Sequence, residues 1–346
     1  MSPAMTEAAR LSALFRDAGA VSVETSVLQP AETLLDLYGE DIRARAYVTS
    51  DPVLGEQMLR PDFTVPVVQQ HMAHGAEPAR YTYQGLVFRS QEAGTGRASE
   101  YLQVGYEVFD RADPAAADAE VFALFAQALD GRGLRAATGD IGILRAAVEG
   151  LSTSERRRAA LLRHLWRPRR FRALLERFGK PVPSARLAAL DVETGAPEIG
   201  LRDASDVSQR IAALKEDAQV APLDAGEVAA LSAILDVAEM APLALAKLRD
   251  IAQTLPAITP ALDRLEARLD ALAARGVDVD ALAFEGSYGR TSMEYYDGFV
   301  FGFHGESGPP IATGGRYDAL TRVLGQGREI PAVGGVIRPE LLEAGA

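Results

Sequence analysis

The chain has 346 residues, of which 48% are hydrophobic and 24% are charged, a composition typical of a globular protein. It contains no cysteine, which excludes disulfides, thiolate catalysis and cysteine-ligated metal sites. The 36 basic and 48 acidic residues give a net charge of −12, which argues against non-specific binding to nucleic acid. We expect a cytoplasmic protein, because no apolar run is as long as a membrane span and no signal-peptide core follows Met1.

Hydrophobic spacing predicts helices and strands in a mixed order along the first 130 residues. Helical spacing is found over residues 6–18 and 117–130, and a strand turns into a helix after residue 61. The strongest predicted strands, 81–89 and 100–109, flank a polar connection and form an antiparallel hairpin. Shorter strands are predicted over residues 21–29, 45–49 and 56–60.

The remainder of the chain predicts an inserted helical region. Residues 141–277 are rich in Ala, Leu, Arg and Glu and are mostly helical, and strand-like stretches return at 281–304 and 330–337. This order indicates an α+β fold rather than alternating βαβ units. We therefore predict one body formed by residues 1–140 and 278–346, with residues 141–277 inserted into it.

One face of the predicted hairpin carries Arg89, Gln103 and Glu107, because side chains alternate along a strand. If Ser90 pairs near Glu100, Gly85 lies opposite Gly105 and the face has a shallow floor. A cation, an amide and a carboxylate together suit a small zwitterion. The pattern alone favours the simpler alternative, a solvated polar face with an ordinary Arg–Glu pair.

Five segments in order resemble one known family. FRSQEAGTGRASEYLQVGYEVFD (88–110) resembles motif 2 of the class II aminoacyl-tRNA synthetases in its histidyl version, and Gly96 and Arg97 fit that motif's loop. The other segments are LRPDFT (59–64), MEYYDGFVF (293–301), ATGGRYDAL (312–320) and PAVGGVI (331–337). The resemblance implies a class II synthetase-like antiparallel sheet flanked by helices.

The resemblance also implies a histidine-binding site, without a metal or a cofactor. Asp62, Thr64 and Gln103 would hold the amino group of histidine. Glu107 and Tyr296 would contact the imidazole ring. Arg89 corresponds to the family residue that contacts the activated phosphate. If residues 293–301 form a strand, Tyr295 and Tyr296 cannot both face the site. The implied site residues are Asp62, Thr64, Arg89, Gln103, Glu107, Tyr295 and Tyr296.

Several positions depart from the synthetase pattern. Thr291 stands where the family has a catalytic arginine, with Arg290 one step away, and Gln91 replaces a glutamate. Motif 3, Gly-Leu-Glu-Arg in the family, reads Arg-Pro-Glu-Leu over residues 338–341. The chain ends at Ala346, about where an anticodon-binding domain would begin. Because developing phosphate charge needs preorganised cations, these losses imply that histidine is not adenylated.

A synthetase-like body without synthetase chemistry resembles the regulatory subunits of ATP phosphoribosyltransferase. The resemblance implies a homodimer within a hetero-oligomer that contains a short-form catalytic subunit. It implies activation of the first step of histidine biosynthesis, from ATP and PRPP to phosphoribosyl-ATP, and feedback by histidine. Two alternatives stay open: a divergent histidyl-tRNA synthetase, and a synthetase-like RNA-binding protein.

Two further features have simpler explanations than a functional site. Residues 156–172 contain eight arginines, which we interpret as a solvated helical face rather than an RNA site or an acidic-partner site. Docking to the catalytic subunit is the remaining explanation. His71 and His74 lie three residues apart, but no acidic residue at ligand spacing completes a metal site.

Overall fold

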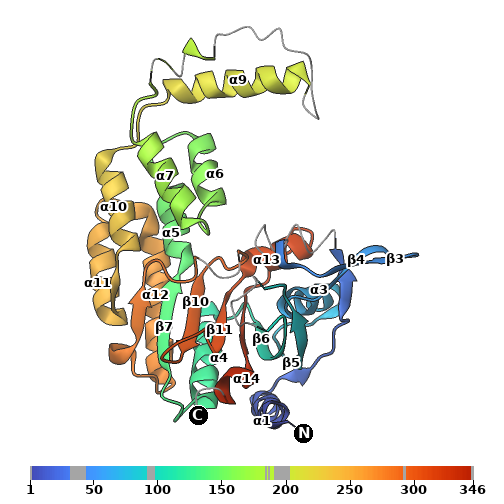
Figure 1. Cartoon of the computed structure of the whole chain (residues 1–346). Coiled ribbons are helices and arrows are strands. Elements are labelled where there is room, and N and C mark those ends of the chain that lie inside the picture. Colours follow the sequence, from blue (N-terminus) through green and yellow to red (C-terminus); the bar gives the residue numbers. More distant parts are fainter. Residues whose placement is uncertain are drawn as a thin grey trace.

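A nine-stranded sheet forms the centre of the computed structural model, which describes residues 2–31, 44–91, 98–183, 185, 188–190, 203–290 and 294–343 (Figure 1). Neighbouring strands are antiparallel, except that β1–β5 and β7–β9 are parallel. Side by side, the strands are β1 (Val21–Ser22), β5 (Ala79–Phe88), β6 (Glu100–Phe109), β12 (Ala332–Ile337), β11 (Ala312–Arg316), β10 (Phe299–His304), β7 (Arg135–Asp140), β9 (Ala283–Glu285) and β8 (Ala238–Met240).

A second, three-stranded antiparallel sheet lies next to α3 (Figure 1). Its strands are, in order, β2 (Leu28–Pro30), β4 (Gly55–Leu59) and β3 (Val48–Asp51). The predicted strand over 21–29 is therefore divided between the two sheets, since β1 pairs with β5 and β2 pairs with β4. The other strands predicted before residue 110 are confirmed, with bounds that differ by up to three residues.

Helices cover both faces of the large sheet. Polar residues begin several of them, because the side chains of Ser2, Asp113, Asp140, Ser154 and Asp224 accept backbone N–H hydrogen bonds. In residues 1–140 and 278–346 the described helices are α1 (Pro3–Asp17), α3 (Thr64–His74), α4 (Pro114–Ala128), α13 (Asp318–Leu324) and α14 (Pro339–Glu343). In residues 141–277 they are α5 (Ile141–Glu149), α6 (Glu155–Arg163), α7 (Pro168–Phe178), α9 (Ala204–Gln219), α10 (Ala225–Leu235), α11 (Ala241–Ile251) and α12 (Thr259–Ala274).

The α+β class is confirmed, with one addition to the predicted helical region. Strand β8 lies inside that region and pairs with β9, so the region contributes an edge strand to the sheet. The three residues of β8 are too few to give a readable alternation of polar and apolar positions. The division of the chain into a body and an inserted region stays a prediction. No helix among the described residues is long and apolar enough to cross a membrane.

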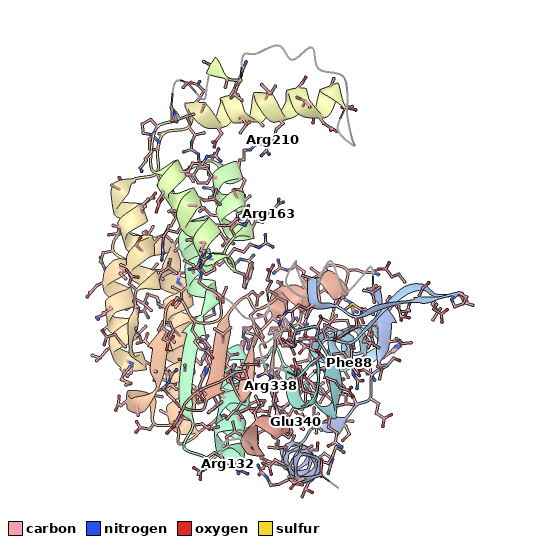
Figure 2. All side chains as sticks on the ribbon, in the orientation of Figure 1. Phe88, Arg132, Arg163, Arg210, Arg338 and Glu340 are labelled. Carbon is pink, nitrogen blue, oxygen red and sulfur yellow. The ribbon has the colours of Figure 1, made fainter. Side chains whose placement is uncertain are left out.

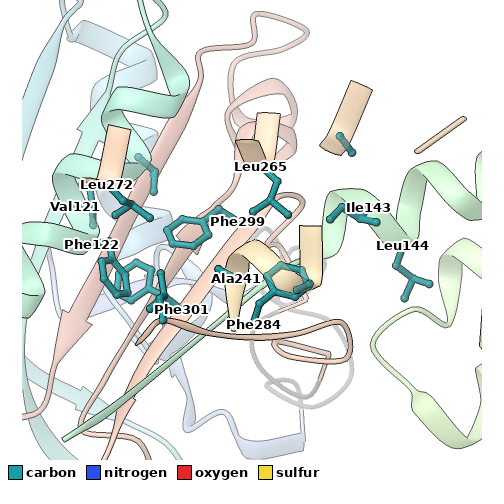
Figure 3. Packing of buried hydrophobic residues seen from close by; sticks show 14 of the residues in the cluster. Val121, Phe122, Ile143, Leu144, Ala241, Leu265, Leu272, Phe284, Phe299 and Phe301 are labelled. Atoms are coloured by element: carbon teal, nitrogen blue, oxygen red, sulfur yellow. The ribbon is translucent and has the colours of Figure 1, made fainter. Parts of the chain in front are cut away.

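The sheet separates two clusters of buried hydrophobic residues. The larger cluster contains the even-numbered residues of β6 and the inner faces of α1, α4, α5 and α12. Figure 3 shows a part of it, in which Phe122 of α4 packs against Phe299 and Phe301 of β10. The smaller cluster lies under α3 and α13, on the side of the sheet that carries Glu107 and most of the predicted site residues.

Candidate functional site

The β5–β6 hairpin places the predicted polar residues on one face of the sheet. Gly85 pairs with Gln103 and Tyr83 pairs with Gly105, so the odd-numbered residues of both strands share a side. The predicted pairing of Gly85 with Gly105 is wrong by two residues, because the connection takes up two more residues of the first strand than expected. Since the strand period is two, every side chain still lies on its predicted face.

Glu107 is a carboxylic acid whose side chain is fully buried, at 0% exposure. Its Oε1 accepts hydrogen bonds from the hydroxyls of Thr64 at 2.9 Å and Tyr83 at 2.8 Å. Its Oε2 accepts a hydrogen bond from the Tyr317 hydroxyl at 2.6 Å. Burial raises the pKa of Glu107 to about 7, against the three hydroxyls, which lower it, and with a small upward contribution from Asp62. Near neutral pH the group therefore exists in both the charged and the protonated form.

Glycines make room for this arrangement. A Cβ atom on Gly334 of β12 would lie 1.5 Å from Glu107 Oε2, and one on Gly105 would lie 2.1 Å from the Tyr83 ring. Gly85 is likewise covered by side chains from the segment before α3. The glycines of the hairpin therefore admit the protein's own side chains, and the predicted shallow floor is occupied by them.

Gln103 has a fully buried amide, at 0% exposure, on the same side of β6 as Glu107. Neither its Oε1 nor its Nε2 has a hydrogen-bond partner among the described residues. Leaving a buried amide unpaired costs about 1–3 kcal/mol, so such a group in a native protein calls for an explanation. A ligand with both a donor and an acceptor provides one.

Tyr295 and Tyr296 both lie in the smaller hydrophobic cluster, with ring centroids 5.0 Å apart. The hydroxyl of Tyr295 donates to Asp62 Oδ2 at 3.3 Å, and Asp62 is 3% exposed. The condition under which the two rings would lie on opposite faces, a strand over 293–301, is not met, because β10 begins only at Phe299. Without strand alternation before Phe299, both rings turn to the same side.

Two arginines, Arg89 and Arg338, approach this face from the ends of two different strands. Arg89 follows β5, and its Nε donates to the carbonyl oxygen of Pro61 at 2.8 Å. Arg338 follows β12 (Figure 2). Burial lowers the pKa of Arg338, with a further decrease from Arg89. Tyr101 interacts with both arginines: the Arg89 guanidinium lies 6.0 Å from the centre of the Tyr101 ring, and Tyr101 opposes the decrease in the pKa of Arg338. Arg338 is not among the site residues predicted from the sequence. The arginine at a position where motif 3 of the family has glycine is a signal that could have identified it.

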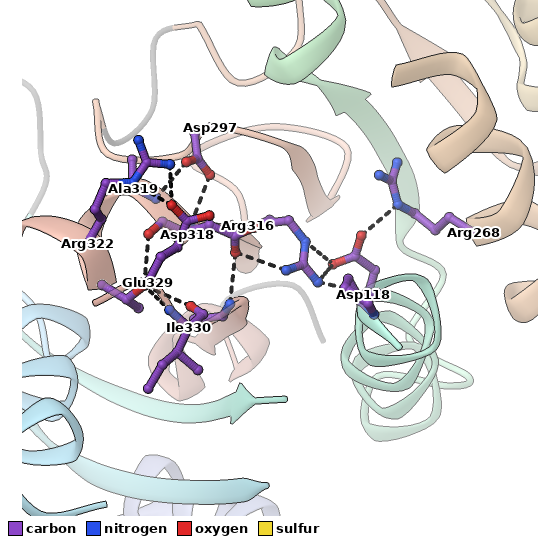
Figure 4. Close-up of polar contacts among 12 residues, drawn as sticks. Asp118, Arg268, Asp297, Arg316, Asp318, Ala319, Arg322, Glu329 and Ile330 are labelled. Carbon is purple, nitrogen blue, oxygen red and sulfur yellow. Dashed lines mark hydrogen bonds and ion pairs between the residues drawn. The ribbon is translucent and has the colours of Figure 1, made fainter. Parts of the chain in front are cut away.

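Tyr83 and Tyr317 were also missed as site residues. Both lie within recognised sequence features, Tyr83 on the hairpin face and Tyr317 in the segment 312–320, but their hydrogen bonds to Glu107 depend on tertiary structure. Arg316, next to Tyr317, donates to Asp118 Oδ1 at 2.7 Å, and Arg268 donates to Asp118 Oδ2 at 2.9 Å (Figure 4). This buried ion-pair network fixes the backbone that presents Tyr317.

The arginine nearest to the lost catalytic position points elsewhere. Arg290 is 5% exposed, its Nε donates to the carbonyl oxygen of Leu165 at 2.8 Å, and its guanidinium lies 4.9 Å from the centre of the Phe171 ring. Burial lowers the pKa of Arg290 to about 10. Leu341, at the family's second arginine position, packs against the larger hydrophobic cluster. Thr291, Gly96 and Arg97 lie outside the described residues.

The arginine-rich segment 156–172 spans α6 and the start of α7. Most of its arginines are exposed, as predicted for a solvated face, but Arg157 is 2% exposed. The Nε of Arg157 donates to Asp217 Oδ1 at 2.8 Å, and this ion pair anchors the end of α9. The prediction of a purely solvated face is therefore wrong for Arg157.

Comparison with known proteins agrees with the likeness seen in the sequence. The family model for histidyl-tRNA synthetase matches residues 4–342. An ATP phosphoribosyltransferase regulatory subunit of Mesorhizobium japonicum is 31% identical, over 97% of this chain and 96% of that protein. Another from Agrobacterium fabrum is 34% identical, over 90% of this chain and 89% of that protein.

The fold is shared with solved structures. A protein from Bacillus halodurans, described as an ATP phosphoribosyltransferase regulatory subunit/histidyl-tRNA synthetase, has a TM-score of 0.73 at 22% identity, over 99% of this chain and 79% of that chain. The histidyl-tRNA synthetase of Nostoc has a TM-score of 0.65 at 18% identity, over 99% of this chain and 72% of that chain. The chain therefore belongs to the family of ATP phosphoribosyltransferase regulatory subunits, which share the fold of histidyl-tRNA synthetase.

Proposed function

We propose that the chain is the non-catalytic regulatory subunit of an ATP phosphoribosyltransferase and that it binds histidine on the Glu107 face of the sheet. A separate short-form catalytic subunit converts ATP and PRPP to phosphoribosyl-ATP, and this chain activates it and transmits feedback by histidine. The names of the relatives at 31% and 34% identity support the regulatory part of this proposal. A homodimer within a cytoplasmic hetero-oligomer is the assembly that we propose.

The buried, unpaired amide of Gln103 carries the proposal of a ligand site. Gln103 lies four residues before Glu107 on the same side of β6, so an amide and an acid face the same ligand. Histidine is matched to this pair, because it combines an ammonium group, a carboxylate and an imidazole whose nitrogens donate or accept.

Each end of histidine has a chemical counterpart in the site. We assign the amino group to Asp62, Thr64 and the Gln103 oxygen, since these are oxygen acceptors on adjoining segments. We assign the imidazole to Glu107 and Tyr296, because a carboxylate with a pKa of about 7 accepts an N–H from the ring. The carboxylate faces the cationic side, where Arg89 and Arg338 both interact with Tyr101.

The residues at or next to the two lost arginine positions support the absence of synthetase chemistry. Stabilising the charge on a phosphoryl group requires cations that point at it. Arg290 is instead bonded to the Leu165 carbonyl, and Leu341 packs in an apolar cluster. We therefore propose that histidine is bound but not activated by ATP.

Calorimetric titration with L-histidine tests the site. We expect binding to weaken about 10- to 100-fold in Glu107→Gln and at least about tenfold in Gln103→Met, since hydrogen bonds to charged ligand groups are lost. Gln103→Met should keep the wild-type stability, because the buried amide has no partner in the protein. The control is Gln127→Met, which replaces an exposed amide on α4.

Unchanged affinity in both site variants would refute the histidine site. The catalytic alternative is tested by histidine-dependent exchange of pyrophosphate into ATP. We expect no exchange above background, and exchange that disappears in Arg89→Ala would show a divergent synthetase instead.

A further inference from the structure

A pocket rich in arginine lies in the helical region, on helices that contribute nothing to the Glu107 face. It encloses about 410 Å³ between α6, α7 and α9. This volume lies within the range of small-molecule sites, which is about 300–1,000 Å³. The charged side chains that line it are Arg156, Arg157, Arg163, Arg177, Arg210 and Asp217.

The charges of the described lining residues are strongly unbalanced. Five arginines face one aspartate, in a chain whose net charge is −12. The single acid is already used, because Asp217 Oδ1 accepts from Arg157 Nε at 2.8 Å and Arg177 lies 3.9 Å from Asp217 Oδ2. The described lining residues therefore carry an excess of positive charge that they do not neutralise among themselves.

Three of these arginines form no ion pair with the described residues: Arg156, Arg163 and Arg210. Figure 2 shows Arg163 on α6 and Arg210 on the side of α9 that is turned towards α6. Some other arginines of the chain do form ion pairs. Arg158, in the same helix, lies 2.9 Å from Glu155. Arg169, Arg170 and Arg172 form no ion pair with the described residues either, so what distinguishes the pocket is that three such guanidinium groups line the same hollow.

We propose that this pocket binds a small molecule that carries a diphosphate group. The planar fork of a guanidinium group matches two phosphoryl oxygens, and three such groups around one pocket suit a ligand with several negative charges. Arg157 provides a rigid wall, since its Nη atoms donate to the carbonyl oxygens of Ala221 and Asp217 at 2.8 and 2.7 Å. Phe178 and two leucines line the apolar part, where the organic body of such a ligand fits.

Calorimetric titration of the full chain with inorganic pyrophosphate, in buffer of low ionic strength without magnesium, tests the pocket. We expect saturable binding of one pyrophosphate per chain that weakens at high salt. Arg163→Gln and Arg210→Gln should each reduce the affinity about tenfold or more, because a charge-assisted hydrogen bond is lost. The matched control is Arg169→Gln, an exposed arginine of α7 outside the pocket, which should change it less than about twofold.

Three results would overturn the proposal. They are no saturable binding of pyrophosphate, an equal loss in the Arg169→Gln control, and binding of hexaglutamate or duplex RNA by a chain that does not bind pyrophosphate. A parallel titration with ADP identifies the source of the diphosphate: tighter binding than pyrophosphate assigns a nucleotide, and equal binding assigns the free ion. Histidine titrations of the same variants should be unchanged, so this test stands apart from that of the Glu107 site.

Discussion

The Tyr317 hydroxyl donates a 2.6 Å hydrogen bond to Oε2 of Glu107, which lies 210 positions earlier in the chain. This contact joins the segment after β11 to β6 across the intervening strand β12. The Tyr317 hydroxyl is one of the few donors that reach the buried carboxylate of Glu107. The stability of the fold and the chemistry of the site therefore depend on the same hydrogen bond.

Replacing that donor should destabilise the protein in a pH-dependent way. We expect Tyr317→Phe to lower the free energy of unfolding by about 1–3 kcal/mol at pH 8, where Glu107 is charged and loses a hydrogen-bond donor. The loss should be smaller at pH 5, because Glu107 is then protonated. Urea unfolding at both pH values measures it, with the exposed Tyr47→Phe as the control. An equal loss at both pH values would show that the bond does not depend on the charge of Glu107.

The raised pKa of Glu107 predicts how stability varies with pH. The folded pKa is about 7 against an ordinary value of 4.5, so the folded state holds a proton that the unfolded state has released between these values. Stability contributed by Glu107 is fully present below pH 4.5 and is lost as the pH rises to 7, by about 3 kcal/mol. Asp297 shifts in the same direction, so wild type and Glu107→Gln must be compared.

Unfolding by urea at pH 4.5 and pH 8 provides this comparison. Wild type should lose about 3 kcal/mol more than Glu107→Gln over the interval, since only the variant lacks the titrating acid. Parallel curves for the two proteins would place the pKa of Glu107 near its ordinary value.

The space beside Glu107 predicts the effect of a single added methyl group. Gly334→Ala brings a Cβ within 1.5 Å of Glu107 Oε2, so the carboxylate must move or β12 must shift. We expect a loss of stability of about 1–3 kcal/mol together with a loss of histidine binding. Gly305→Ala is the control, since its nearest neighbour would lie 3.8 Å away. Thermal unfolding and histidine calorimetry measure both effects, and wild-type behaviour of Gly334→Ala would mean that Glu107 is not confined as described.

The alternation of the hairpin was sufficient to place Gln103 and Glu107 on one face, because a period of two survives an error of two residues in register. The motif resemblance added Asp62, Tyr295 and Tyr296, which lie outside the hairpin. Neither approach could predict that Tyr83 and Tyr317 bond to Glu107, since side-chain packing across three strands decides this.

Long-range pairing also explains what the sequence did not predict in the helical region. The burial of Arg157 depends on Asp217, 60 residues later, and a local run of arginines carries no information about that partner. Strand β8 forms only because β9 offers an edge, since its three residues have no strand pattern of their own. In both places a distant contact outweighs local sequence preference.

The central claim is that this chain regulates a separate ATP phosphoribosyltransferase and responds to histidine through the Glu107 face. The most direct measurement is the rate of phosphoribosyl-ATP formation by a short-form catalytic subunit, titrated with this chain in the presence and absence of histidine. The account predicts a rate that rises to saturation with the chain, and inhibition by histidine that is weakened in Gln103→Met while activation is kept. A rate that does not depend on the added chain would contradict it.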